Sequence, residues 1–220
     1  MEDKINRITI GIRFRRSFRI TDISGKVVDS LLHDENSPFS ENFFKEVGET
    51  TSKGKILLSE KQDFLSIDID SLVLSLNTNN LESTLEKIQN VYFPYFSKVI
   101  FNEFEIYNVN RLGIIFEHKV ENLSSVDEII KKLSSNKIEV PDNLELRFSK
   151  KLPTNVGLIT KDVIDFYNAI FTYQKNSSGL DVKLDYQLYF SPEIATIEDV
   201  EFGKFVDSAK NYLKNNFYNW

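Results

Sequence analysis

Residues 8–20 read ITIGIRFRRSFRI, and apolar side chains occupy almost every even position of this stretch. Only Arg16 interrupts the even series, whereas the odd positions carry threonine, glycine, serine and three arginines. This alternation is typical of a strand with one buried and one solvated face. The stretch therefore predicts a strand that brings Arg13, Arg15 and Arg19 to the solvated face of a sheet.

Alternating patterns recur further along the chain. Residues 63–69 and 72–76 alternate in opposite phase, which predicts a tight turn or a bulge at residues 70–71. Residues 104–118 predict another strand. Residues 163–173 and 182–190 predict two strands of a hairpin, because they flank the sequence Asn-Ser-Ser-Gly.

Apolar residues at helical spacing occur in three other segments. They predict a helix over residues 81–100 that Pro94 kinks or divides, a helix that begins near Ser125, and an amphipathic helix that starts after residue 199. Alternation dominates over the continuous Val/Ile runs of a buried parallel sheet. The sequence therefore predicts an α+β fold, an antiparallel or mixed β-sheet with helices packed on it, closing with a C-terminal amphipathic helix. We expect a single domain over residues 1–220, with a two-lobed division near residues 136–143 as the alternative.

The composition narrows the class of protein. The 220 residues are 41% hydrophobic and 27% charged, with a formal net charge of −6, which is ordinary for a globular protein. The absence of cysteine excludes disulfides, thiol catalysis and cysteine-based zinc sites. The acidic start resembles no secretory signal, and no run approaches the ~18 apolar residues that cross a bilayer. We expect a cytoplasmic protein that does not bind membranes.

Two short motifs carry a resemblance that extends over most of the chain. The sequences NRLGIIF at residues 110–116 and LDYQLY at residues 184–189, together with the N-terminal Arg/Phe-rich strand, resemble one prokaryotic family of proteins of about this size. Members of this sporadically distributed family have an Arg-Leu/Ile-Gly central strand and a conspicuous aspartate in a late strand. The family has no assigned activity, so the resemblance implies no catalytic residues. Its patchy distribution implies mobile or antiphage-defence gene neighbourhoods.

Signatures of catalysis are absent from the sequence. It contains no glycine-rich phosphate loop and no nucleophile elbow, and His33 and His118 each stand alone. Asp68 and Asp70 would point the same way from a strand and are the candidates for a Mg²⁺ site. The alternative is that they face water at the end of a strand, where aspartate commonly caps turns. The sequence thus favours a non-catalytic protein, with no catalytic residues, no cofactor and no metal.

The N-terminal arginines are the strongest local bias, since five of the seven arginines lie in the first 19 positions. Guanidinium groups on one face bind carboxylates or phosphates. Arg13, Arg15 and Arg19 therefore predict an anion-binding or partner-binding site. The alternatives are ion pairs within the chain, an acidic protein partner, and nucleic acid, which the acidic composition disfavours.

Three aromatic residues lie in the last four positions, Phe217, Tyr218 and Trp220. Chain ends are normally polar and frayed. Either this tail folds back on the domain, or it binds a partner.

The sequence thus leaves three hypotheses of function. The first is a non-catalytic protein-interaction module, an accessory subunit of a prokaryotic multi-protein system that binds a protein partner or itself. The second is a protein that binds or senses nucleic acid through the arginine strand. The third is a metal-dependent hydrolase or nuclease at Asp68 and Asp70.

Overall fold

The computed structural model of the protein describes residues 5–39, 43–45, 56–133, 144–153 and 164–217. The strands in this part of the chain form one sheet in the order β2-β3-β4-β5-β1-β6-β9-β8-β7. All neighbouring strands are antiparallel. The α+β prediction is confirmed, with an antiparallel sheet and a C-terminal helix. The proposed division near residues 136–143 lies outside the described residues.

Strands and helices alternate in blocks along the chain. The strands are β1 (Arg7–Phe14), β2 (Phe44–Lys45), β3 (Ile56–Glu60), β4 (Asp63–Asp68), β5 (Ser71–Asn77), β6 (Val109–Val120), β7 (Leu144–Pro153), β8 (Ile164–Asn176) and β9 (Gly179–Ile194). The main helices are α1 (Arg19–His33), α5 (Leu123–Leu133) and α6 (Phe202–Phe217). A further helical run comprises α3 (Leu81–Lys87), η2 (Ile88–Tyr92), α4 (Phe93–Tyr95) and η3 (Phe96–Glu103), and a short turn of 3₁₀ helix, η4 (Ile197–Asp199), precedes α6.

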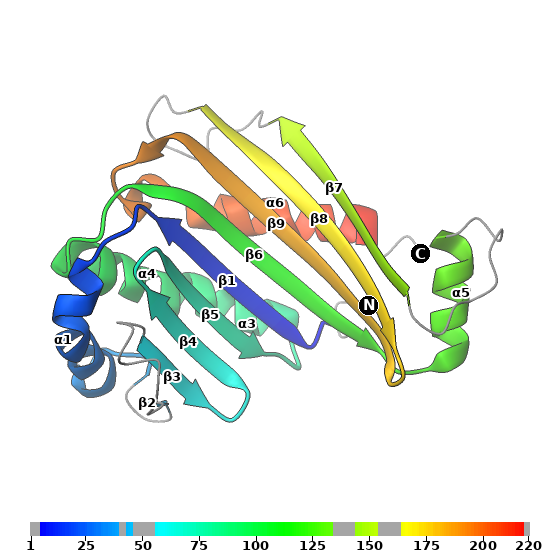
Figure 1. Ribbon diagram of the computed structural model, residues 1–220, viewed down its shortest axis with the longest axis horizontal. Helices are drawn as coiled ribbons and strands as arrows, with labels where there is room; N and C mark the ends of the chain where they lie inside the picture. Colours follow the sequence, from blue (N-terminus) through cyan, green and yellow to red (C-terminus); the bar gives the residue numbers. More distant parts are fainter. Residues whose placement is uncertain (1–4, 40–42, 46–55, 134–143, 154–163, 218–220) are drawn as a thin grey trace.

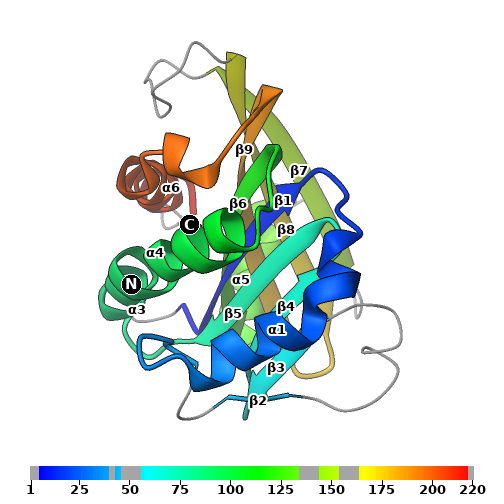
Figure 2. The same cartoon turned by 90° about the vertical axis from the view of Figure 1, so that its left-hand side faces the viewer.

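The helices cover one face of the sheet. Figure 1 shows the run from α3 to α4 together with α6 behind the strands, and Figure 2 shows the same two layers from the side. The ring of Phe14 on β1 lies against that of Phe101 on η3, with centroids 5.9 Å apart. Phe93 and Phe202 stack at 3.8 Å and join the two helical segments. The hydrophobic core therefore lies between the sheet and this helical layer.

The two halves of the chain repeat one order of elements. In the first half β1, α1, strands β3–β5 and the helical run follow one another, and in the second β6, α5, strands β7–β9 and α6 do so. The order within the sheet mirrors this repeat about the central β1–β6 pair, and α1 and α5 lie at opposite ends of the sheet (Figure 1). The sequences GIRF at residues 11–14 and GIIF at residues 113–116 stand at equivalent places. The pair Gly11–Gly113 marks the approximate twofold axis.

The first strand is shorter than its sequence predicts. β1 ends at Phe14, where its register with β6 shifts, and the N–H of Arg15 then donates to the carbonyl of Asn108. The chain enters α1 at Arg19, and Ile20 is buried as part of this helix. The prediction of a strand through residue 20 is therefore wrong, because Phe18 and Ile20 extend the even series after the strand has ended.

The remaining elements agree more closely with their sequence patterns. A turn at Ile69–Asp70 joins β4 to β5, as the change of phase predicts. The hairpin of β8 and β9 is confirmed, with Asn176 opposite Gly179. The helical run continues on both sides of Pro94, which lies in α4 between two π-helical segments.

Candidate functional site

The second face of the sheet, which we call the open face, is covered by no helix in the described part of the chain (Figure 1). Odd-numbered residues of β1 lie on it, because the even-numbered residues from Ile8 to Phe14 are buried in the core. Their partners on β5 and β6 lie on the same face, as do the partners of β6 on β9. The open face therefore displays polar residues from strands that are distant in sequence.

A hollow of about 140 Å³ lies at the centre of the open face. Its floor is Gly11 opposite Gly113, which carry no side chains to fill it. Val73 and Ile115 contribute apolar walls. The polar lining, which includes Arg13, Arg111, Asp185 and Gln187, gives the hollow its chemistry. We call this hollow the central pit.

Two arginines stand at one side of the central pit. Arg13 on β1 lies directly opposite Arg111 on β6. The side chain of Arg13 is 52% exposed, and the one ion pair it forms within the described residues is with Asp70 at 3.9 Å. Like charges directly opposite each other in a sheet are unfavourable. An anion between the two guanidinium groups would relieve this repulsion.

Arg111 is held in place by a row of stacked side chains. Together with Arg111 this row comprises Tyr189, Phe166 and Lys151, and we call the four residues the aromatic ladder. Its Nη1 donates to the hydroxyl of Tyr189 at 3.3 Å, and its guanidinium lies 5.7 Å from the centroid of that ring. Tyr189 and Phe166 stack at 4.8 Å with an interplanar angle of 2°. The Nζ of Lys151 lies 3.9 Å from the centroid of Phe166. These contacts restrict the orientation of Arg111.

A carboxylate and an amide form the opposite part of the central pit. Gln187, which is buried, donates from Nε2 to Asp185 Oδ2 at 2.5 Å. Its Oε1 accepts from the hydroxyl of Tyr189 at 2.8 Å and from Asn168 Nδ2 at 3.4 Å. Burial raises the pKa of Asp185, although the hydrogen bond from Gln187 and the charges of Arg111 and Arg147 oppose the rise.

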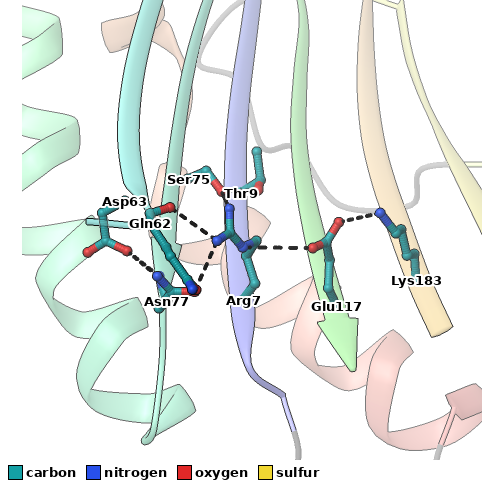
Figure 3. A network of polar contacts seen from close by, with 8 residues as sticks. All are labelled: Arg7, Thr9, Gln62, Asp63, Ser75, Asn77, Glu117 and Lys183. Atoms are coloured by element: carbon teal, nitrogen blue, oxygen red, sulfur yellow. Dashed lines mark hydrogen bonds and ion pairs between the residues drawn. The ribbon is translucent and has the colours of Figure 1, made fainter. Parts of the chain in front are cut away.

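The other end of β1 has a different electrostatic arrangement. Figure 3 shows Arg7 donating to Ser75, to the carbonyl of Gln62 and to Asn77, with distances of 3.1–3.2 Å. Its Nε lies 4.0 Å from Glu117, which also pairs with Lys183 at 2.8 Å. These opposite charges satisfy one another, so the Arg7 network is structural.

The three arginines predicted to form one site lie in different places. Arg13 lies on the open face, whereas Arg15 follows the end of β1 and Arg19 begins α1. Arg19 forms an ion pair with Glu105. The prediction that they share one sheet face is therefore wrong, since the strand ends before two of them. Their role in binding a partner stays a prediction.

The two aspartates considered for a metal site belong to the turn between β4 and β5. The Oδ1 of Asp68 accepts the backbone N–H of Ile69 at 2.7 Å, and Asp70 faces Arg13. No group of three or more histidine, aspartate or glutamate side chains among the described residues is placed to hold a metal ion. Asp68 thus acts as a turn cap.

Most of the aromatic tail lies outside the described residues of the structure. Phe217 ends α6, while Tyr218 and Trp220 lie outside the described residues. The prediction that this tail binds a partner stays a prediction.

Two comparisons with known proteins were without a match. No family model matches the chain, and no curated protein matches it. In the described part of the chain, no helix is long and apolar enough to cross a membrane.

Sequence reasoning singled out Arg13 but did not assign the other residues of the central pit to a site. Arg111 and Gly113 lie in the motif at residues 110–116, and Asp185 and Gln187 lie in the motif at residues 184–189. The pairing of β6 with β9 brings the two motifs side by side. The repeated Gly-Ile-x-Phe sequence was a further signal, because it marks the two strands that form the floor of the pit.

Proposed function

We propose that the protein is a non-catalytic interaction module that binds an acidic segment of a partner protein on the open face of the sheet. Arg13 and Arg111 are the residues that bind the partner's carboxylates. The observation that carries this proposal is the position of the two arginines, directly opposite each other beside the central pit. The absence of catalytic signatures from the sequence supports a place as an accessory subunit of a prokaryotic multi-protein system, and the resemblance to a sporadically distributed family supports a defence-related setting for it.

The chemistry of the arginine pair favours a carboxylate ligand. Guanidinium groups bind carboxylates through two parallel hydrogen bonds. Arg111 is oriented by the aromatic ladder, while the exposed Arg13 can adjust to the ligand. A partly ordered pair of this kind loses less conformational entropy on binding than two free side chains.

The aromatic rings beside Arg111 favour protein over nucleic acid as the partner. The rings of Phe166 and Tyr189 stack on each other and carry a cation on their outer sides. They therefore offer little free surface for the base stacking that single-stranded nucleic acids require.

Fluorescence anisotropy with a labelled glutamate-rich peptide tests this proposal. We expect the double variant Arg13→Ala/Arg111→Met to bind the peptide at least about tenfold more weakly than the unaltered protein, because two charged contacts are lost. Methionine at position 111 keeps an apolar stem on the ring of Tyr189. Arg16→Ala is the matched control, since Arg16 is exposed but lies beyond the end of β1.

Two results would contradict the proposal. The first is equal binding of the peptide by the unaltered protein and the double variant. The second is a preference for single-stranded oligothymidylate over the peptide, with affinity that falls steeply as salt rises. The second result would support the nucleic-acid hypothesis instead.

A further inference from the structure

We infer that the central pit receives the side chain of one asparagine or glutamine from the partner segment, next to the acidic residue that Arg13 and Arg111 bind. This inference rests on the proposed function and adds the identity of the recognised side chain. Three properties of the pit support it, namely its size, its open acceptor and the charges around it.

The size of the central pit fits a single side chain. Its volume of about 140 Å³ is well below the roughly 300–1,000 Å³ of pockets that hold drug-sized molecules. The floor of Gly11 and Gly113 lets a group approach the backbone closely. Val73 and Ile115 offer apolar contact to the methylene groups of an entering side chain.

Asp185 directs one acceptor oxygen into the pit. Its Oδ2 accepts from Gln187, whereas no donor in the described part of the chain contacts Oδ1. Oδ1 lies 3.8 Å from the place that a Cβ on Gly113 would occupy, so it is directed over the floor of the pit. An N–H group from a ligand in the pit can donate to this oxygen in a hydrogen bond to a charged acceptor.

The surrounding charges favour a neutral donor. Arg13 and Arg111 line the same pit and Arg147 acts on Asp185, so a lysine in the pit would meet repulsion. A carboxylate in the same place would accept from the arginines but has no N–H to donate to Asp185, whose charge opposes it. A primary amide avoids both problems, because its N–H₂ donates to Asp185 while its carbonyl oxygen accepts from an arginine.

The internal repeat shows that the two halves of the pit differ in chemistry. By register, Ser71 is the counterpart of Asp185, Val73 of Gln187 and Thr9 of Arg111. The second half therefore replaces two short hydroxyl side chains and a valine by a carboxylate, an arginine and an amide. This asymmetry gives the bound segment a single orientation.

Peptides of matched composition test the inference. We would measure the anisotropy of labelled glutamate-rich peptides of equal length that carry one Gln, Leu or Lys at the centre. We expect the unaltered protein to bind the Gln peptide about tenfold more tightly than the Leu peptide, the usual effect of one hydrogen bond to a charged group. The Lys peptide should gain no such advantage.

Three variants locate the effect in the pit. Gly11→Ala adds a methyl group to the floor, and that group meets no other atom within 4 Å, so the fold should persist while the pit is filled. Asp185→Leu removes the acceptor. Both variants should bind the Gln and Leu peptides equally. Gly25→Ala is the control. Its added methyl group also has no atom within 4 Å, but residue 25 lies on α1, so this variant should keep the preference for the Gln peptide.

The failure of this inference differs from the failure of the proposed function. If glutamate-rich peptides bind through Arg13 and Arg111 but Gln gives no advantage, the inference is wrong and the proposed function stands. A preference for Gln that survives in both Gly11→Ala and Asp185→Leu would also overturn it. If no acidic peptide binds, both fail together.

Discussion

Arg13 lies directly opposite Arg111 on the two central strands of the sheet. At the other end of the same pair of strands, Arg7 lies opposite Glu117. Opposite charges in facing positions stabilise a sheet, whereas like charges destabilise it. We therefore expect the arginine pair to lower the stability of the fold, as residues kept for binding commonly do.

Replacing Arg13 by threonine should leave the free energy of unfolding unchanged or raise it by about 0.5 kcal/mol, because cross-strand repulsion is removed. The weak, exposed pair with Asp70 is the one ionic contact it loses within the described residues. Urea denaturation at low salt measures the change. A loss of more than about 1 kcal/mol would show that Arg13 has a structural role.

The equivalent change at Arg7 should have the opposite sign. Arg7→Thr removes three hydrogen bonds and the contact with Glu117 (Figure 3), so we expect the free energy of unfolding to fall by about 1–2 kcal/mol. Glu117 keeps Lys183 as a partner, which limits the loss. Denaturation under the same conditions provides the comparison, and equal stabilities of the two arginine variants would contradict the division between a structural and a binding end of β1.

Asp185 should make stability depend on pH. Burial raises its pKa above the ordinary value of 3.8, so the folded protein holds this proton more tightly than the unfolded chain. The protonated carboxyl therefore stabilises the fold below that ordinary pKa, and this contribution is lost as pH rises through the folded-state pKa.

In the variant Asp185→Asn, the side chain at position 185 is neutral at every pH. The variant should be more stable than the unaltered protein at about pH 7, and the difference should disappear near pH 3. Chemical denaturation of both proteins at the two pH values measures this difference. Lower stability of the variant at neutral pH would mean that the ionised carboxylate is favourable in the fold.

Gly179 should tolerate no side chain at the start of β9. Its φ is +140°, and an added Cβ would lie 2.3 Å from the carbonyl oxygen of Val120. We expect Gly179→Ala to lower the free energy of unfolding by about 3 kcal/mol, since backbone strain and a clash add together. Thermal denaturation measures the loss, and an unchanged midpoint would show that the β8–β9 hairpin can shift away from β6.

The strands that follow local patterns could be predicted from the sequence. β4 buries alternate residues, β5, β8 and β9 do so over most of their length, and short turns join the strands in pairs, so the local signal and the fold agree. α1 could not be predicted in the same way. Phe18, which is 66% exposed, and Ile20 continue the alternation of β1 by coincidence, although Ile20 is buried as part of a helix.

The candidate site depended on information that local patterns do not contain. Arg111 meets Tyr189, and Gly113 meets Gln187, only through the register of β6 with β9. Register is set by the pairing of whole strands, and shifting it by one residue would move every side chain to the other face. The sequence therefore singled out arginines as candidates, but not which arginines come together.

The two similar halves of the sheet belong to one polypeptide, so equivalent positions on the two central strands can carry different residues. Two separate copies of one half, paired through β1, would place Gly11 opposite Gly11 and surround the hollow with identical walls. Such a homodimer could present only a symmetric surface, so any ligand would see the same groups from both directions. Covalent linkage of the halves removes this constraint, because a substitution in one half is no longer copied into the other. The difference between Thr9 and Arg111, or between Ser71 and Asp185, is available only to the linked chain.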